Sequence, residues 1–215
     1  MGDHLYASNL ALAAGRGETN TASKILEAAV LEFDEQGFEK ASFAGVATRC
    51  GVSKSLVSYH FPTKTLLGCS VLNTAYPSGI FMGSERHTES PVAELLCAAV
   101  SVALHVVHTP LARAALKLRR ELQGLAVGLP CRYSGWTAHA AGLFREAQRT
   151  ELIDATVDID FQSRLLVGTV SGLISLSEAT GSFVSLPSDV NEAIRRQLSL
   201  LGYIGDLPVP YAEAW

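Results

Sequence analysis

The amino-acid sequence predicts an all-α protein. The 215 residues are 48% hydrophobic but only 7% aromatic, and many of the apolar positions hold Ala or Leu. No runs of Val, Ile and Thr alternate with polar residues between hairpin-type turns, so nothing in the sequence favours a β-sheet. Apolar residues instead recur at i, i+3, i+4 and i+7, the spacing of one helical face. A chain of this length can bury a sizeable core as one or two domains.

The first predicted segment is a flexible arm over residues 1–20. Gly, Asn, Asp and Ser surround a short apolar run at residues 10–14, which is too short for a signal sequence and lacks a basic start. We therefore expect a cytoplasmic protein. Arg16 in this arm is interpreted either as a solvated residue or as one that reaches a DNA minor groove.

The first helix is expected from Thr21 to Gln36. Gly37 follows it and supplies the left-handed residue that commonly ends a helix. The apolar residues of its buried face are Ile25, Ala28, Ala29 and Phe33. The acidic residues expected on its opposite, solvated face are Glu27, Glu32, Asp34 and Glu35.

The segment Ser42–His60 predicts two short helices joined at a glycine. Ser42 and Ser53 stand at N-cap positions, and Gly51 can adopt the positive φ that a sharp turn between helices requires. The second helix, from Lys54, is short and polar on one side. This pattern is a helix-turn-helix, and its second helix suits a DNA major groove. The predicted DNA-binding residues are Ser42, Arg49, Ser53, Lys54, Ser55, Ser58, Tyr59, His60 and Lys64.

The charge distribution supports this interpretation locally, although the whole chain is acidic. A net charge of −4 argues against a generally basic nucleic-acid coat. Between Lys40 and Ser84, however, the sequence contains no Asp or Glu, whereas Arg49, Lys54 and Lys64 fall within the span. A generic helical hairpin with a solvated basic face is the alternative.

A fourth helix is expected after the sequence Phe61-Pro62, which ends the preceding helix. Thr63 can cap the new helix, which continues through Val71. Lys64 lies in its first turn, where the helix N-terminus adds a positive pole, so we expect Lys64 to contact a phosphate. This helix is also the expected lever between the two domains.

Five more helices are expected, over residues 91–108, 110–122, 135–150, 160–181 and 187–201. The first two open with Ser-Pro and Thr-Pro, which combine a cap with proline at the first helical position. The last two carry too little charge for lone solvated helices, and glycines 168 and 172 would let another helix approach closely. We predict a four-helix bundle shared by two subunits, hence a homodimer, with packing inside one chain as the alternative. Charged residues interrupt the apolar runs, so no membrane partner is expected.

The sequence carries no recognisable motif for catalysis, cofactor or metal binding. It has no GxSxG, HExxH or P-loop, and its four cysteines lack the spacing of a zinc site. We expect reduced thiols, no cofactor and no metal. His105 and His108 lie on one apolar helix and are interpreted as core or pocket-wall residues. An enzyme and a protein-binding helical adaptor are the competing classes.

Several short motifs follow one another in residues 21–68. They are Ile25-Leu26-Glu27-Ala28-Ala29, Phe33, Gly37-Phe38, Cys50-Gly51-Val52-Ser53-Lys54 and His60-Phe61-Pro62-Thr63-Lys64-Thr65-Leu66-Leu67. In this order and at these separations they resemble the DNA-binding domain of TetR-type repressors. The resemblance implies a repressor that binds double-stranded operator DNA through residues 21–68, with a ligand-binding and dimerisation domain over residues 69–215. The family usually places a phosphate-contacting tyrosine where this chain has Ser58, so that contact would be weakened or moved to Tyr59.

A narrower resemblance covers about residues 110–172. The segments Thr109-Pro110-Leu111-Ala112-Arg113-Ala114-Ala115-Leu116-Lys117-Leu118, Gly135-Trp136, Asp158-Ile159-Asp160 and Val167-Gly168-Thr169 look like those of receptors for γ-butyrolactone signals, which control antibiotic production. That subfamily has a tryptophan in its pocket, and Trp136 stands at the matching position; a packing role in the core is the alternative. Gln123, Tyr133 and Thr169 are further candidate contacts to a lactone or a small furan acid.

The two resemblances together imply a repressor that a small, mostly apolar inducer releases from its operator. Two other functions stay open at this point. The chain could regulate efflux or metabolism in answer to an unrelated ligand, or it could be a receptor relative that has lost hormone binding.

Overall fold

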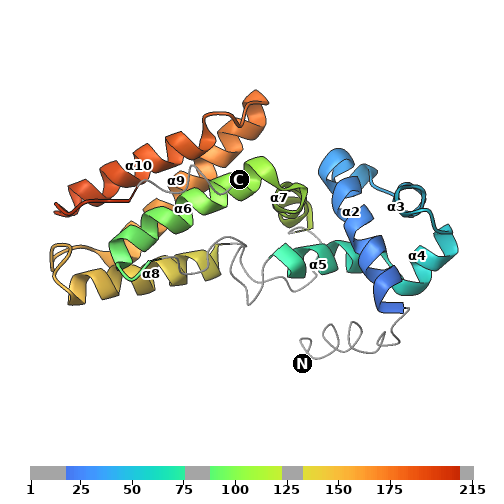
Figure 1. Ribbon diagram of the computed structural model, residues 1–215, viewed down its shortest axis with the longest axis horizontal. Helices are drawn as coiled ribbons and strands as arrows, with labels where there is room; N and C mark the ends of the chain where they lie inside the picture. The colour runs from blue at the N-terminus through green and yellow to red at the C-terminus, as the bar shows by residue number, and fades with distance from the viewer. Residues whose placement is uncertain (1–17, 76–87, 123–132, 209–215) are drawn as a thin grey trace. The chain divides into compact units, whose positions relative to one another are not determined.

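A computed structural model describes residues 18–75, 88–122 and 133–208, which are helical with short connections and contain no strand (Figure 1). The all-α fold class is therefore confirmed. The helices are α2 (Glu18–Lys40), α3 (Phe43–Cys50), α4 (Lys54–His60), α5 (Lys64–Ala75), α6 (Pro91–His108), α7 (Pro110–Leu122), α8 (Ser134–Arg149), α9 (Ile159–Thr180) and α10 (Leu186–Leu200). The chain forms two compact units, Met1–Thr74 with Arg113–Val127 and Ala75–Ala112 with Gly128–Trp215.

Helix α2 of the first unit is interrupted at Gly37, where φ is 71°. Glycine adopts this positive φ without steric cost, and the predicted helix end at Gly37 is confirmed, but its ψ of 178° is extended and not that of the expected left-handed helical residue. The chain then continues as one more helical turn to Lys40. The amides of Phe38 and Glu39 open this turn and donate to the Glu121 carboxylate of α7, at 2.9 and 3.3 Å.

Helices α3 and α4 form the predicted helix-turn-helix, with α3 packed against α2 (Figure 1). Ser42 caps α3, because its Oγ accepts from the Gly45 amide at 3.0 Å. Gly51 then takes φ 69°, and Ser53 caps α4 by accepting from the Leu56 amide at 3.1 Å. The buried apolar side chains of the two helices are Val46, Ala47 and Val57.

Helix α7 joins the first unit through charged side chains that reach α2. Arg113 donates from Nε to both carboxylate oxygens of Asp34, at 3.2 and 3.1 Å, and from a terminal nitrogen at 2.8 Å. Lys117 donates to the main-chain oxygen of Asp34 and lies 3.5 Å from its carboxylate. Only the first three residues of α7 group with the second unit. The first unit thus extends past the boundary predicted at residue 68, along α5 and onto α7, and the functional assignment of the two domains stays a prediction.

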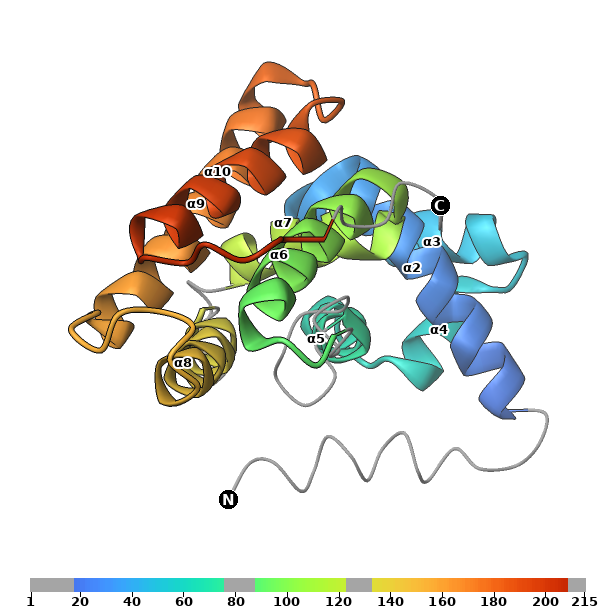
Figure 2. The ribbon, with the colours of Figure 1, turned by 60° about the vertical axis from the view of Figure 1, so that its left-hand side comes forward.

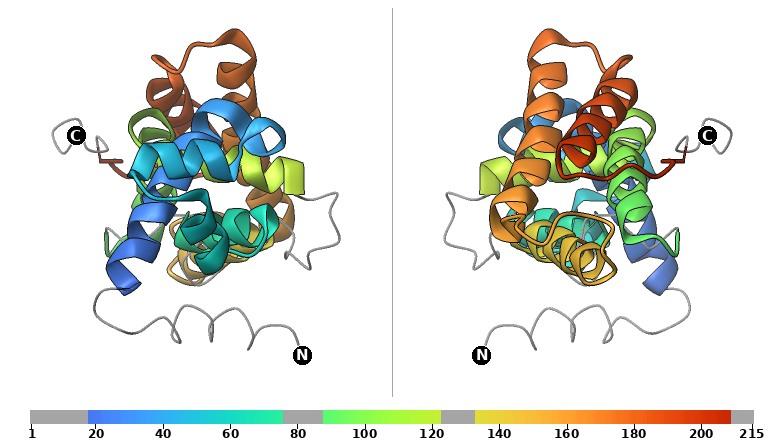
Figure 3. Two further views of the ribbon diagram at one scale, coloured as in Figure 1. Left: turned by 90° about the vertical axis from the view of Figure 1, so that its right-hand side faces the viewer. Right: turned by 90° about the vertical axis from the view of Figure 1, so that its left-hand side faces the viewer.

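The second unit is built around α6, which contacts α8, α9 and α10 (Figure 2). Helices α9 and α10 run side by side, as the right-hand view of Figure 3 shows. A polar contact joins them, since the Gln197 side-chain amide donates to the main-chain and side-chain oxygens of Gln162 at 3.1 and 2.8 Å. Leu186, Val190, Ile194 and Leu198 of α10 are fully buried.

Helix α6 is, of the helices in the described residues, the one long and apolar enough to cross a membrane. In the structure 78% of that helix is buried inside the fold. Its apolar character is thus accounted for by its place in the core of a helical unit.

Candidate functional site

The recognition helix α4 exposes a polar surface made of the predicted residues. Lys54, Ser55 and Ser58 are exposed, and 71% of the Tyr59 surface is accessible. Val57 on the opposite side is completely buried. The helix is held from beneath while one face stays open, as contact with base edges requires.

Four of the predicted DNA contacts also have roles within the helix-turn-helix. Ser42 and Ser53 accept amide hydrogen bonds as N-caps, which leaves each hydroxyl hydrogen able to donate to a phosphate. The Ser58 hydroxyl donates to the main-chain oxygens of Lys54 and Ser55, at 3.2 and 3.1 Å. His60 is half-buried and packs edge-on against Tyr59, with ring centroids 5.3 Å apart.

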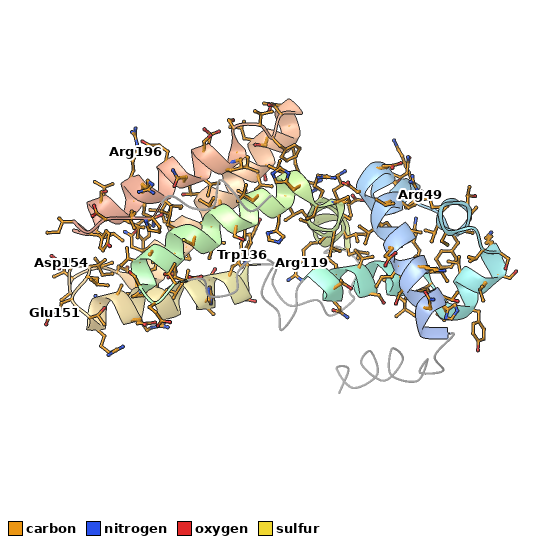
Figure 4. The ribbon with its side chains drawn as sticks, viewed as in Figure 1. Arg49, Arg119, Trp136, Glu151, Asp154 and Arg196 are labelled. Carbon is orange, nitrogen blue, oxygen red and sulfur yellow. The ribbon has the colours of Figure 1, made fainter. Side chains whose placement is uncertain are left out.

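Arg49 is engaged inside the unit by two acidic residues of α2 (Figure 4). Its Nε donates to Glu32 at 2.9 Å, and its terminal nitrogens both donate to Glu35. Hydrogen bonds from the guanidinium to Glu35 and then to Glu32 raise the pKa of Arg49 above its ordinary value. Arg49 therefore fixes α3 to α2, and its predicted DNA contact stays a prediction.

The expectation of a solvated acidic face on α2 is wrong for Glu32 and Asp34. Only 6% of Glu32 is exposed, and the Asp34 side chain is 13% exposed. The sequence reasoning missed the physical cause, which is that Arg49 pairs with Glu32 while Arg113 and Lys117 pair with Asp34. A buried carboxylate persists only when such partners surround it.

Lys64 is likewise tied to the first unit. Its ammonium donates to the main-chain oxygens of Glu39 and Ala41, at 2.9 and 3.0 Å, and lies 4.7 Å from the centre of the Phe38 ring. An ammonium has three donors, so one hydrogen remains for a phosphate. The structure thus adds a stabilising role for Lys64 to the predicted phosphate contact, which stays a prediction.

An apolar cavity lies inside the second unit, between α6, α8 and α9. Its volume is about 40 Å³, and Trp136 forms part of its wall. Figure 4 shows Trp136 near the N-terminal end of α8. Aliphatic side chains such as Leu95, Leu143 and Val170 make up most of the rest. The indole nitrogen of Trp136 is buried. The cavity has the character of a site for a small, mostly apolar molecule.

The structure does not bring the other predicted ligand contacts into this cavity. Tyr133 instead lines a wider open groove of about 820 Å³ on another side of α8 and α9, together with Arg145 and Arg164. Thr169 lines neither the cavity nor that groove. Gln123 lies outside the described residues, as do Arg16 and most of the predicted N-terminal arm.

The sequence reasoning also missed His139, which lines the cavity. Its position three residues after Trp136 was the available signal, because residues three apart lie on one helical face. No cluster of His, Cys, Asp or Glu suited to a metal ion occurs within residues 18–75, 88–122 and 133–208.

Comparison with known proteins agrees with this architecture. Residues 25–67 match the family model described as bacterial regulatory proteins, tetR family. The chain is 23% identical over 181 residues to the A-factor receptor protein of Streptomyces griseus, which covers 84% of this chain. The match spans 63% of the length of that receptor.

Two solved structures share the fold over nearly their whole length. One, concerned with the molecular basis for control of antibiotic production by bacterial hormones, has a TM-score of 0.73 and 24% identity, covering 85% of this chain and 97% of its own. A γ-butyrolactone receptor described as ArpA-like has a TM-score of 0.60 and 22% identity, covering 84% and 98%. The helix-turn-helix at residues 25–67 is thus that of the family of bacterial regulatory proteins named tetR, and most of the chain has the fold of the two solved structures.

Proposed function

We propose that the chain is a ligand-responsive repressor that binds a pseudo-palindromic operator as a homodimer. A small, mostly apolar signal such as a γ-butyrolactone or a furan releases the repressor from the operator. The repressor acts in the cytoplasm, and its target genes control antibiotic biosynthesis. The observation that carries this proposal is the pairing, in one chain, of an open recognition helix with an apolar cavity walled by Trp136. The names of the similar receptors support the ligand class.

An apolar stripe on α9 supports the homodimer. Phe161, Leu165 and Leu176 are 50%, 42% and 59% exposed on one face of this helix. Gly168 and Gly172 share the face, and a Cβ added at either would meet no atom of the described residues within 4 Å. Packing within the described part of the chain therefore does not explain these glycines, whereas a helix of a second subunit could approach closely there.

A dimer is also what the recognition helix requires. Helix α4 has only seven residues, and one such helix reads too few base pairs for useful specificity. Two copies related by a two-fold axis place their recognition helices in successive major grooves, about 34 Å apart. The operator is then expected to be a pseudo-palindrome.

The ligand is expected to act by widening the cavity. A volume of about 40 Å³ is well below the roughly 150 Å³ of cavities known to hold a benzene ring. A ligand that contains a ring must therefore move α6, α8 or α9 apart. Because only Thr109 separates α6 from α7, a shift of α6 passes directly into α7, which Asp34 fixes to α2 through Arg113. This route is more direct than the lever expected for α5.

The two lysines of the helix-turn-helix are expected to differ when each is replaced by alanine. Lys54 is exposed at the start of α4, so Lys54→Ala leaves folding unchanged, costs about 1–3 kcal/mol of specific binding and relaxes one operator position. Lys64→Ala loses hydrogen bonds to two main-chain oxygens, which lowers the free energy of unfolding by about 1–2 kcal/mol. Because Lys64 is expected to contact a phosphate, Lys64→Ala also reduces the salt dependence of DNA affinity, measured as the slope of log affinity against log salt concentration, by about 1 on every DNA sequence. Gel shifts on operator and random DNA, with urea titrations, separate the two patterns; equal losses on both DNAs for Lys54→Ala would remove its base-reading role.

The ligand response is tested with Trp136→Ala. We expect operator affinity within a few-fold of wild type, because Trp136 lies outside the helix-turn-helix, together with loss of release by the inducing ligand. Paired gel shifts across a titration of butyrolactones and furans measure both, with circular dichroism to establish folding. Tyr133→Phe is the matched control, since Tyr133 lines the outer groove and not the cavity. If the ligand fully released a folded Trp136→Ala protein from the operator, Trp136 would have only a packing role.

A further inference from the structure

The cavity between α6, α8 and α9 is lined almost entirely by apolar side chains. The part of α6 that lines it contributes only Leu95, Ala98, Ala99 and Val102, and α9 contributes only Leu166, Val167 and Val170. Helix α8 supplies the exceptions, Trp136 and His139. No Lys, Arg, Asp or Glu is among the described residues that line the cavity.

His139 carries an unusual atom in this setting. Its Nε2 is buried and has no hydrogen-bond partner among the residues that the structure describes. A buried polar atom without a partner costs free energy, and most such atoms in folded proteins are paired. If His139 only filled the core, nothing would offset the free-energy cost of its unpaired nitrogen. If His139 contacts a ligand, the hydrogen bond formed on binding offsets that cost.

The position of His139 also relates it to the tryptophan. Trp136 and His139 are three residues apart on α8, so their side chains lie on the same helical face, with Cβ atoms about 5–6 Å apart. A ring that packs against the indole therefore brings a substituent within reach of the imidazole. The two residues together would fix both the place and the orientation of a small molecule.

We infer that His139 is the specificity-determining residue of the cavity and that its Nε2–H donates to the carbonyl oxygen of an uncharged ligand. This inference rests on the proposed function and narrows it to neutral lactones, esters or ketones. A ligand carboxylate would be buried without an opposite charge, because no Lys or Arg is among the described residues that line the cavity. Burying an unpaired charge costs much free energy. A neutral carbonyl brings only the acceptor that Nε2–H needs.

Three probes of matched shape test the inference by calorimetric titration of the full-length protein. They are 5-hexyl-γ-butyrolactone, 2-hexyltetrahydrofuran, which keeps the ring and chain but lacks the carbonyl, and 5-hexylfuran-2-carboxylate, which carries a charge. The titrations are run at pH 8.0, above the range in which histidine ordinarily gains a proton. For the wild type we expect the lactone to bind about tenfold tighter than the ether, and the carboxylate to bind at least about tenfold weaker than the lactone.

Substitutions at His139 then assign the preference to this side chain. His139→Leu is expected to remove the roughly tenfold advantage of the lactone while leaving the ether unchanged. His139→Gln keeps a donor group and is expected to keep most of the advantage. Thr137→Val is the matched control, because Thr137 lies on the same helix but lines the outer groove, and its hydroxyl bonds the Tyr133 main-chain oxygen at 2.8 Å.

The possible results separate the inference from the function on which it rests. Equal losses of lactone and ether binding in His139→Leu would show a packing role and overturn the inference alone. Carboxylate binding as tight as lactone binding would overturn the selection of a neutral ligand. If none of the three probes binds the wild type or releases it from DNA, the proposed ligand class fails and the inference fails with it.

Discussion

A Leu176→Glu protein is expected to sediment as a monomer and to lose on the order of 100-fold in operator affinity. Leu176 is 59% exposed on the apolar stripe of α9. In a two-fold interface the same patch faces itself, so a charge placed there meets its own copy across the axis. Juxtaposed like charges cost several kcal/mol, which is enough to separate a dimer of ordinary affinity. Sedimentation velocity and gel shift measure the two effects.

Leu31→Glu is the matched control for this prediction. Leu31 is 42% exposed but belongs to α2 of the first unit and not to the apolar stripe of α9, so we expect the same substitution there to leave assembly intact. Circular dichroism establishes that both proteins are folded. A Leu176→Glu protein that stays dimeric and binds the operator normally would remove α9 from the interface.

An Arg49→Ala protein is expected to lose about 2–3 kcal/mol in free energy of unfolding, and with it most operator binding. The substitution leaves Glu32 buried without its cation, and uncompensated buried charges are strongly destabilising. Glu32 also accepts from the Ser42 amide at 3.3 Å and lies against Gly45, where a Cβ would stand 2.1 Å from its Oε1. Losing Arg49 therefore loosens the attachment of α3 itself. Urea denaturation measures the change.

Glu35→Ala separates this structural role from a direct DNA contact. Glu35 also pairs with Arg49, but its side chain is 53% exposed, and exposed ion pairs contribute about 1 kcal/mol or less. We expect this protein to keep its stability and its operator affinity. If Arg49→Ala instead kept full stability and lowered the salt slope of binding by about 1, Arg49 would be a phosphate contact.

The helix boundaries could be predicted from the sequence because the signals that set them are local. Ser42 and Ser53 cap amides three residues ahead, and Ser90 does the same before Pro91. Gly51 and Gly181 end their helices in the left-handed conformation. Each signal lies within a few residues of the boundary it determines.

The partners of charged and buried side chains could not be predicted in this way. Arg49 reaches Glu32 across 17 residues, and Arg113 reaches Asp34 across 79. Such pairs depend on how helices pack, which periodicity alone does not specify. The same limit hid His139, whose burial depends on the residues that α6 and α9 bring to the cavity.

Helix α7 has a consequence for the way in which the molecule unfolds. Its first three residues group with the second unit and the rest with the first, while its backbone hydrogen bonds run from each residue to the fourth one before it and so cross that boundary. Melting either unit would cut α7 within its first turn, where helix formation is least favourable. The two units are therefore expected to melt in one calorimetric transition, and a molecule bound in the cavity would protect the helix-turn-helix against heat without touching it.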